Sequence, residues 1–496
     1  MSAVIETLSE SERRFDLLRR GVGLLAGPLA LVLVLLLPMP ELSSEAHRLA
    51  AIATLVVVWW ITEAIPIPIT ALFGIALAVV FGVATPAVAF APFADPIIFL
   101  FIGSFILSRA IVVHGVDARF AAAVLAIPVV GRSFTATCVA VTALVALISA
   151  WMSNMVATAM MLPVLLAILR TEAHSGVGSP AVSRTMLLVL AYAASIGGMI
   201  TPVGAAPNLI TIGLLDSLAN TRITFLTWVA IGLPISFVMI VLLLAVARMK
   251  LLPLRHAQAE RLDRGSAPGK WLPGQLNASI AFATTVVLWV LPGILSSLAP
   301  DAPLTEFFVT RINEAVAAIV GATLLFVLPV DWPRRQFTIG WAEASKIDWG
   351  TILLLGGGFS LGRMMFDTGL AANLAEGIIG ISGSETLWTI TAIATLIGII
   401  LTELTSNTAA TSMLVPVVIS ICIAAGVDPV APAIGTCLGS SLAFMLPIST
   451  PSNAIVYGTG LVPLGAMIRF GILMDILGFF VIQIGLWILV PLLGHG

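Results

Sequence analysis

A serine-asparagine pair with a hydroxyl residue four positions earlier occurs twice in this apolar chain. The copies lie about 250 residues apart and are Ser149, Ser153 and Asn154, and then Thr402, Ser406 and Asn407. Lipid offers no hydrogen-bond partners, so polar groups repeated at membrane depth indicate a binding site. Hydroxyl and amide oxygens suit a sodium ion, whereas free N–H groups at a helix N-terminus suit an anion such as a carboxylate. The alternative is that these residues only cap helices.

The composition is that of a helical membrane protein. Hydrophobic residues make up 59% and charged residues 10% of the chain, the mean hydropathy is +1.12, and apolar runs of about 20 residues recur throughout. We predict an all-α polytopic membrane protein embedded in the lipid bilayer. The charges lie in short loops rather than in one basic patch, so we expect no nucleic-acid partner. Protease and nucleophile motifs are absent, so we expect no enzyme, and the three cysteines lack metal-ligand spacing.

The apolar segments divide the chain into two similar parts. Two of them contain a polar tip and are predicted to be helical hairpins, at about 133–169 and 386–426. Two others, at about 186–215 and 430–460, are too long for one straight span and contain paired prolines, so we predict broken helices. The expected order is a cytoplasmic tail (1–20), a first helix (21–48), a first repeat (49–248), a cytoplasmic linker (249–275) and a second repeat (276–496).

The distribution of lysine and arginine predicts the orientation in the membrane. With the N-terminus inside, 18 basic residues fall on the inner side and 3 on the outer side. This topology has eleven crossings and places the C-terminus outside. Each hairpin arm is long enough to cross the bilayer, so fifteen crossings remain an alternative with the same loop positions. We expect a multi-pass protein of the cell inner membrane or plasma membrane.

Three pairs of matching motifs indicate an inverted repeat. Besides the serine-asparagine pairs, offset by 253, the stretch 103–115 matches 357–369 at an offset of 254. The stretch 202–210 matches 447–455 at an offset of 245. The two copies of the first motif are separated by an odd number of crossings, so the halves enter the membrane in opposite directions. That architecture places a binding site at mid-membrane between the halves.

Three segments of the chain resemble one transporter family. They are Trp60-Ile-Thr-Glu-Ala-Ile-Pro-Ile-Pro to Leu72, Thr402-Glu-Leu-Thr-Ser-Asn-Thr408, and Phe444-Met-Leu-Pro to Val456. The chain resembles the divalent anion/sodium symporter (DASS) family over about residues 50–490. The resemblance implies a sodium-coupled carrier of dicarboxylates, citrate or sulfate. It further implies a homodimer with eleven transmembrane helices and two re-entrant hairpins, whose transport part moves like an elevator against a scaffold.

The resemblance also implies binding residues. The first sodium site would comprise Ser149, Ser153, Asn154 and the carbonyl of Gly204. The second sodium site would comprise Thr402, the carbonyl of Thr405, Asn407 and the carbonyl of Ser449. The dianionic substrate would lie between the hairpin tips and touch Ser153, Asn154, Ser406, Asn407, Thr408, Thr450 and Pro451. Co-transported Na⁺ would supply positive charge, since the motifs contain no lysine or arginine.

Two departures from the family pattern bear on the substrate. Met155 stands where the first signature normally ends in threonine, and Ala205-Ala206 lacks the usual hydroxyl. We therefore expect a C4-type dicarboxylate such as succinate, fumarate or malate rather than citrate or sulfate. The alternatives are a sodium-independent dicarboxylate or tricarboxylate exchanger, a sulfate carrier, and a sodium/proton antiporter. Antiporters usually expose carboxylates at the site, whereas these motifs carry hydroxyls and amides.

Four charged residues within or beside apolar segments have two interpretations. Arg109 and Arg363 occupy equivalent positions of the repeat, where they could pair with substrate or stabilise helix ends. We favour the structural role for both. Glu63 and Glu403 precede Pro66 and a serine-asparagine pair, and we favour structural hydrogen bonding over proton coupling.

Overall fold

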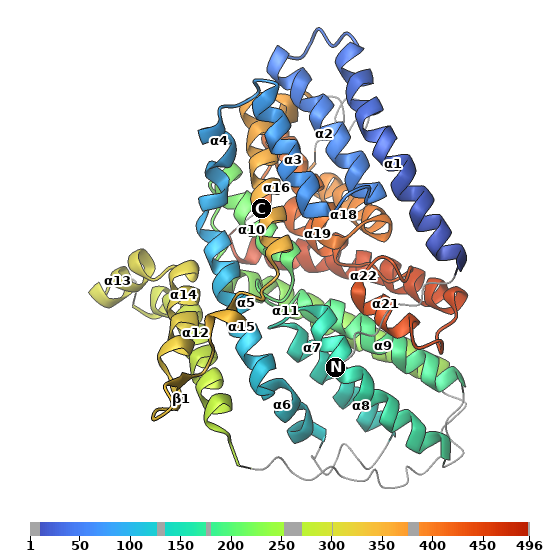
Figure 1. Ribbon diagram of the computed structural model, residues 1–496, viewed down its shortest axis with the longest axis vertical. Helices are drawn as coiled ribbons and strands as arrows, with labels where there is room; N and C mark the ends of the chain where they lie inside the picture. The colour runs from blue at the N-terminus through green and yellow to red at the C-terminus, as the bar shows by residue number, and fades with distance from the viewer. Residues whose placement is uncertain are drawn as a thin grey trace.

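The computed structural model describes residues 10–125, 134–174, 180–251, 270–299, 301–374 and 386–494. The regular secondary structure of these residues is helical apart from one short antiparallel pair of strands, β1 (Pro329–Asp331) and β2 (Gln336–Phe337) (Figure 1). Nine helices of the described residues are long and apolar enough to cross a membrane, or ten if the bent pair α13 and α14 counts as one span. The prediction of an all-α polytopic membrane protein is confirmed.

The first half of the chain contains one hairpin and one broken helix. Helices α7 and α8 form the predicted hairpin, and α9 and α10 form the predicted broken helix, interrupted at residues 199–205. The helices are α1 (Glu10–Leu36), α2 (Ser44–Thr62), α3 (Ile67–Val80), α4 (Pro86–Phe90), the short 3₁₀ turn η1 (Ala91–Ala94), α5 (Pro96–His114), α6 (Val116–Leu125), α7 (Phe134–Ser149), α8 (Asn154–His174), α9 (Pro180–Gly198), α10 (Ala206–Ala219) and α11 (Phe225–Leu251).

The second half repeats this order. Helices α18 and α19 form the other predicted hairpin, and α20 and α21 form the other broken helix, interrupted at residues 441–450. The helices are α12 (Pro273–Leu298), α13 (Pro303–Arg311), α14 (Glu314–Val327), α15 (Trp341–Ala344), α16 (Trp349–Asp367), α18 (Leu387–Leu404), α19 (Asn407–Ala425), α20 (Val430–Ser440), α21 (Pro451–Tyr457) and α22 (Leu464–Leu492).

Several predicted boundaries differ from the structure or lie outside the described residues. Helix α1 begins at Glu10, inside the expected tail of residues 1–20, because the charged residues before the apolar run continue its helix. The second helix begins at Ser44, where Ser43 caps it, so the first expected helix also ends earlier than residue 48. Most of the expected linker, residues 252–269, lies outside the described residues.

The two hairpins and the two broken helices form one packed body. Arms α7 and α8 contact α9, and arms α18 and α19 contact α20 in the same way. The second piece of each broken helix packs against the hairpin of the other half. Helix α10 of the first half contacts α19 of the second, and α21 of the second half contacts α8 of the first. Figure 1 shows α7, α8, α9, α18, α19 and α21 on the same side of α5. This crosswise packing, which the sequence did not predict, brings each hairpin against the second piece of the other half's broken helix.

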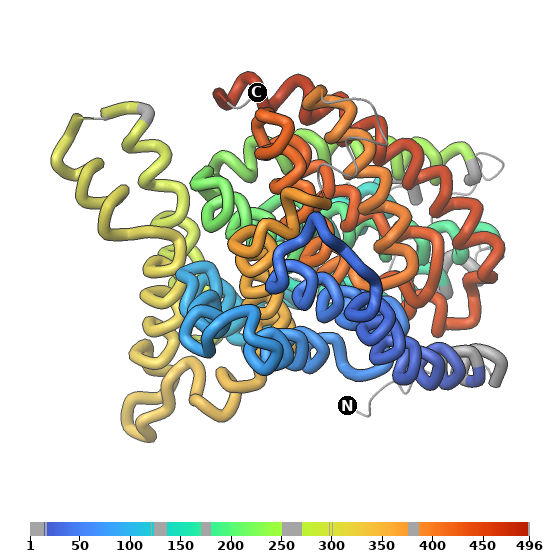
Figure 2. The backbone as a smooth tube through the Cα atoms, turned by 90° about the horizontal axis from the view of Figure 1, so that it is seen from above, coloured from blue at the N-terminus to red at the C-terminus, as the bar shows by residue number. Residues whose placement is uncertain are grey.

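A separate arm consists of α12, α13 and α14. Figure 2 shows it projecting to one side of the main body. It meets the body through α5, which packs along α14. Large apolar side chains on the arm are exposed, among them Leu276, Val287 and Ile294, as expected of a surface that faces lipid or another subunit.

Equivalent glycines hold equivalent helix pairs together. A Cβ on Gly103 of α5 would lie 2.6 Å from the backbone carbon of Ala318 in α14, and a Cβ on Gly357 of α16 would lie 2.6 Å from the Cβ of Ala71 in α3. Small residues allow such close approach between membrane helices. The motif that revealed the repeat in the sequence is therefore a helix-packing motif in both halves.

The charged residues beside apolar segments pair with neighbours, which confirms the structural interpretation. Arg109 forms an ion pair with Glu343 at 2.6 Å, and Arg363 pairs with Asp367 at 3.0 Å. Hydrogen bonds from Lys346 and then from Arg109 hold the pKa of Glu343 below its usual range. Glu63 lies 3.2 Å from the guanidinium of Arg19 at the end of α2.

We expect Gly103→Ala to destabilise the protein, because the added methyl group meets backbone atoms of α14 rather than a flexible side chain. Overpacking of this kind costs about 1–3 kcal/mol. The Tm in detergent should fall, while the control Gly465→Ala, whose Cβ would meet nothing within 4 Å, should leave it unchanged. Equal Tm values for both variants would contradict the close packing of α5 on α14.

Candidate functional site

The hydroxyl residue before each hairpin tip makes the same two contacts in both halves. The Ser149 hydroxyl lies 2.8 Å from Asn154 Oδ1 and 2.7 Å from the carbonyl oxygen of Ala194 in α9. The Thr402 hydroxyl lies 2.8 Å from Asn407 Oδ1 and 2.6 Å from the carbonyl oxygen of Ser440 in α20. Each hydroxyl therefore ties its hairpin tip to the end of the adjacent broken helix.

These contacts bring together more oxygens than protons. A hydroxyl has one proton to donate, yet two acceptor oxygens lie within hydrogen-bonding distance of it in each half. Ser149 and Thr402 are both fully buried, so water does not compete for these groups. Three converging oxygens with one proton among them are suited to a small hard cation, which prefers hydroxyl, amide and carbonyl oxygens.

Two glycines bring backbone carbonyls close to the first cluster. A Cβ on Gly198 would lie 2.4 Å from Asn154 Oδ1, and a Cβ on Gly204 would lie 2.6 Å from the carbonyl oxygen of Gly198. The Thr201 hydroxyl donates to the carbonyl of Ala150 and accepts from the N–H of Gly204 at 3.1 Å. The break in the first helix therefore lies directly against the hairpin tip.

An asparagine side chain donates hydrogen bonds to backbone carbonyls at each helix break. Asn208 donates from Nδ2 to the carbonyls of Gly198 and Thr201, both at 2.8 Å. Asn453 donates from Nδ2 to the carbonyls of Ala443 and Leu446, at 2.9 and 3.0 Å. Both residues lie in the third matched motif, but the sequence analysis gave them no role. The two asparagines occupy equivalent positions in the matching stretches 202–210 and 447–455, and this equivalence could have identified them.

Part of the set acts as helix caps. Ser406 accepts a hydrogen bond from the N–H of Ala409 at 3.2 Å, and Thr450 accepts one from the N–H of Asn453 at 3.1 Å. The capping interpretation is therefore correct for Ser406, whereas the cap formed by Thr450 was not predicted. Asn407 serves another purpose, because its Oδ1 contacts Thr402 instead of a helix N-terminus.

The remaining candidate residues differ in accessibility. Ser153 and Pro451 are exposed, Thr408 is half-buried, and Met155 is 46% exposed at the first tip. Thr405 is buried, and its hydroxyl donates to the carbonyl of Trp60 at 3.3 Å, which joins the second tip to the end of α2. The two tips thus differ most at Met155 and Thr408, where one presents a thioether and the other a hydroxyl.

Glu403 holds the second helix break in place. Its carboxylate accepts hydrogen bonds from the N–H groups of Met445 and Leu446 and from the Ser449 hydroxyl, at 2.8, 3.2 and 2.6 Å. This confirms the structural hydrogen bonding expected of Glu403. The position equivalent to Glu403 in the first half is Ala150, so only the second break is held by a carboxylate.

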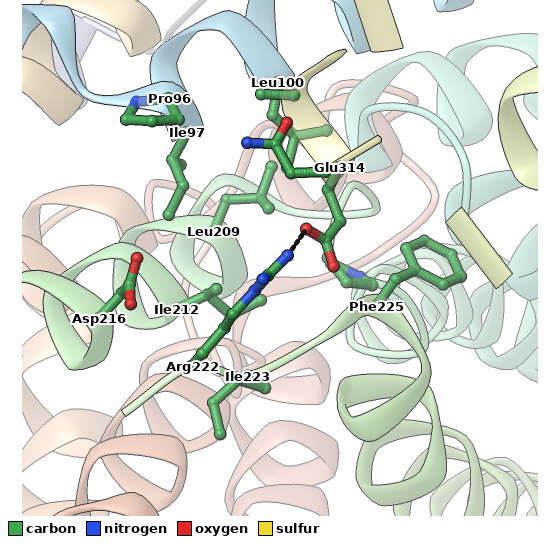
Figure 3. A pocket seen from close by; sticks show the side chains of 13 residues that line it. Pro96, Ile97, Leu100, Leu209, Ile212, Asp216, Arg222, Ile223, Phe225 and Glu314 are labelled. Atoms are coloured by element: carbon green, nitrogen blue, oxygen red, sulfur yellow. Dashed lines mark hydrogen bonds and ion pairs between the residues drawn. The ribbon is translucent and has the colours of Figure 1, made fainter. Parts of the chain in front are cut away.

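A cavity of about 330 Å³ borders the first helix break between α5, α10 and α14. Pro202 of the break lines it, together with Asp216 at the end of α10. Figure 3 shows Arg222 and Glu314 meeting across this cavity, with their charged groups 3.0 Å apart. The ion pair joins the loop after α10 to the arm helix α14. It therefore connects the packed body of hairpins to the separate arm.

The fold and the arrangement of polar groups indicate the class of protein. Two hairpins and two broken helices, exchanged between repeated halves around buried hydroxyl, amide and carbonyl oxygens, are the architecture of a secondary transporter. Among the described residues no group of three or more His, Cys, Asp or Glu side chains could hold a transition metal. The architecture is therefore that of a membrane transporter.

Sequence comparison identifies the family. The pattern described as "Sodium:sulfate symporter transmembrane region" matches residues 19–493, and the chain belongs to this family. The chain is 31% identical over 485 residues to a Staphylococcus saprophyticus protein named sodium-dependent dicarboxylate transporter SdcS, covering 95% of this chain and 91% of that protein. It is 32% identical over 450 residues to an uncharacterized transporter of Haemophilus influenzae, covering 90% of this chain and 91% of that one.

One solved structure shares the fold. The crystal structure of the Alcanivorax borkumensis YdaH transporter, described as having an unusual topology, superposes with a TM-score of 0.55 at 18% identity. The match covers 81% of this chain and 87% of that chain. The family resemblance seen in the sequence is thereby confirmed at the level of family and of transporter fold.

We expect Asn453→Ala to destabilise the protein, because it leaves the carbonyls of Ala443 and Leu446 without a donor at the break. Leaving a buried polar group without its partner costs about 1–3 kcal/mol. The Tm in detergent should fall clearly. Asn373→Ala, which removes a bond to the carbonyl of Gly369 in its own helical turn, is the control and should change Tm little. A Tm equal to wild type in Asn453→Ala would show that the break does not need this side chain.

Proposed function

We propose that the protein imports C4-type dicarboxylates, such as succinate, fumarate or malate, together with sodium ions. The observation that carries the proposal is the duplicated cluster in which Ser149 and Thr402 each face two acceptor oxygens with one proton. A sodium ion relieves the repulsion among these oxygens, whereas a neutral solute would not. The names of the SdcS relatives, which describe sodium-dependent dicarboxylate transport, support the same substrate class.

The sodium ligands that we propose follow the two clusters. The first ion takes oxygens from the first hairpin and the first break, and the second ion takes oxygens from the second hairpin and the second break. The proposed ligands are Ser149, Ser153, Asn154 and the carbonyl of Gly204 for the first site, and Thr402, the carbonyl of Thr405, Asn407 and the carbonyl of Ser449 for the second.

The substrate in this proposal lies between the hairpin tips. The tips carry helix N-termini, whose N–H groups favour an anion, and they contain no cationic side chain. Bound sodium therefore supplies the positive charge that a dianion needs, which couples the two solutes energetically. The proposed substrate contacts are Ser153, Asn154, Ser406, Asn407, Thr408, Thr450 and Pro451.

Movement completes the mechanism that we propose. The hairpins and broken helices form one packed body, and the arm of α12–α14 together with α5 forms a second part to which a partner subunit could bind. An elevator movement of the body within a homodimer would carry the site from one side to the other. The N-terminus would lie in the cytoplasm and the C-terminus outside, in the cell inner membrane or plasma membrane.

We expect labelled succinate to enter proteoliposomes only when an inward sodium gradient is present. Thr402→Val keeps the side-chain shape but removes the hydroxyl. The sodium concentration for half-maximal uptake should rise about tenfold or more, because the ion loses an oxygen ligand and changes around a metal site typically cost about 10–100-fold in affinity. Thr391→Val is the matched control, because that hydroxyl bonds only to the carbonyl of Leu387 in its own helix. Uptake that ignores sodium but needs internal dicarboxylate would instead establish an exchanger.

We expect Met155→Thr to broaden the range of anions. The new hydroxyl would face the substrate as Thr408 does at the other tip, and one hydrogen bond of about 1 kcal/mol corresponds to about fivefold in affinity. Competition by citrate and sulfate against labelled succinate should strengthen by about that factor. The exposed Met249 of α11 provides the control variant Met249→Thr. Wild-type protein that prefers citrate or sulfate over C4 dicarboxylates would overturn the substrate assignment.

A further inference from the structure

A second cavity, of about 380 Å³, lies between the first hairpin and the arm. One side of it is formed by α7 and the tip that follows, and the other side by the end of α5, the start of α6 and α12. None of the residues proposed to bind sodium or substrate lines it. Its volume is in the range of binding sites for small organic molecules.

Aromatic side chains from both sides form much of the cavity wall. Trp151 at the tip of the first hairpin meets Phe282 of α12 edge to face, with the ring centroids 5.1 Å apart. Phe120 of α6 and Trp271, which precedes α12, also line the cavity. The position equivalent to Trp151 in the second half is Leu404, so this aromatic wall belongs to the first half alone.

One carboxyl group lines this apolar cavity. Asp117, in the first turn of α6, is 8% exposed, and it is the one charged residue among the described residues that line the cavity. The guanidinium of the nearby Arg119 is used elsewhere, since its central carbon lies 4.4 Å from the centroid of the Trp271 ring and it donates to Gln275 Oε1 at 3.4 Å. Among the described residues no basic side chain forms an ion pair with Asp117.

The charge and the walls of the cavity together select a kind of ligand. A buried carboxylate without a counter-ion is costly, and a cation in the cavity would remove that cost. Aromatic faces attract organic cations, above all quaternary ammonium groups. A metal ion fits poorly, because the walls offer it few oxygens and the Ser279 hydroxyl already donates to the carbonyl of Gln275 at 2.8 Å. A dianion would be repelled by Asp117.

We propose that this cavity binds a lipophilic organic monocation, in which an alkylated ammonium group is attached to an aromatic body. The ammonium group lies against Asp117, and the aromatic body lies between Phe120, Trp151 and Phe282. Because Trp151 belongs to the hairpin tip, the bound cation joins this tip to α6 and α12. The site differs from the proposed substrate site in both place and charge, and binding of the cation does not depend on which anion is transported.

Binding of a radiolabelled probe to the purified full chain in detergent tests this proposal. The probe is (naphthylmethyl)trimethylammonium, and neopentylnaphthalene is the neutral analogue of the same shape. Wild-type protein should bind the cation about tenfold or more tightly than the neutral analogue, and Asp117→Asn should lose this preference while its Tm stays close to wild type. Asp301→Asn, which changes an exposed carboxylate, is the control and should bind like wild type.

A second variant tests the aromatic wall. Phe120→Leu keeps an apolar side chain but removes the aromatic face, so it should weaken binding of the cation by about threefold or more and leave the neutral analogue little affected. Equal affinity of wild type and Asp117→Asn for the cation, or binding of neither probe, would overturn the proposal. A neutral analogue that binds wild type as tightly as the cation would also overturn it, because the cavity would then take an apolar molecule such as a lipid chain.

Inhibition of transport provides a further readout, which rests on the proposed function. The cation should lower the maximal rate of sodium-driven succinate uptake without changing the succinate concentration for half-maximal uptake, because it lies outside the proposed substrate site. Asp117→Asn should transport succinate and resist the cation. Inhibition that excess succinate overcomes would place the cation at the substrate site and overturn the proposal. A protein that binds the cation through Asp117 but does not transport succinate would contradict the proposed function alone.

Discussion

The structure depends on ending helices inside an apolar layer. At each hairpin tip and helix break, backbone N–H and carbonyl groups lose their helical partners at a depth where water cannot replace them. Side chains in both halves satisfy these groups: Asn208 and Asn453 bridge carbonyls across the breaks, while Ser149 and Thr402 tie the hairpin tips to them. The same polar groups that permit the interruption are those available to a transported ion. The groups that stabilise the interrupted helices are therefore among those that we propose bind the ion.

The two halves satisfy the polar groups at their hairpin tips and helix breaks with the same geometry but with different residue types. The contacts of Ser149 and Thr402 agree between the halves to within 0.1 Å. The neighbouring positions do not agree, since Ala150 corresponds to Glu403 and Met155 corresponds to Thr408. The second half thus contains more polar groups at its tip and a charged group at its break. In the proposed mechanism, such a repeated fold with unequal halves would bind two ions in similar ways and surround a dianion with two different sets of groups.

Much of the fold could be predicted because its signals are local. Apolar runs, paired prolines and matched motifs located both hairpins and both broken helices, and the predicted tips fall at the turns before Asn154 and Asn407. The site was predicted as residue types at a fixed spacing, and the structure brings Ser149 to Asn154 and Thr402 to Asn407. The roles of Asn208 and Asn453 could not be predicted in this way. Their partners come from elsewhere in the fold or from carbonyls that carry no side-chain signal.

The sequence by itself determined the membrane setting, the repeat and the positions at which helices must end, because hydropathy and proline content act through local physical rules. Only the tertiary structure decided which of these ends meet. It exchanges α10 and α21 between the halves and packs α22 against α18 and α20. It also shows that Arg109 and Arg363 pair with nearby carboxylates. The physical reason is that a polar group buried in lipid is governed by the partners that packing brings to it, and packing joins residues hundreds of positions apart.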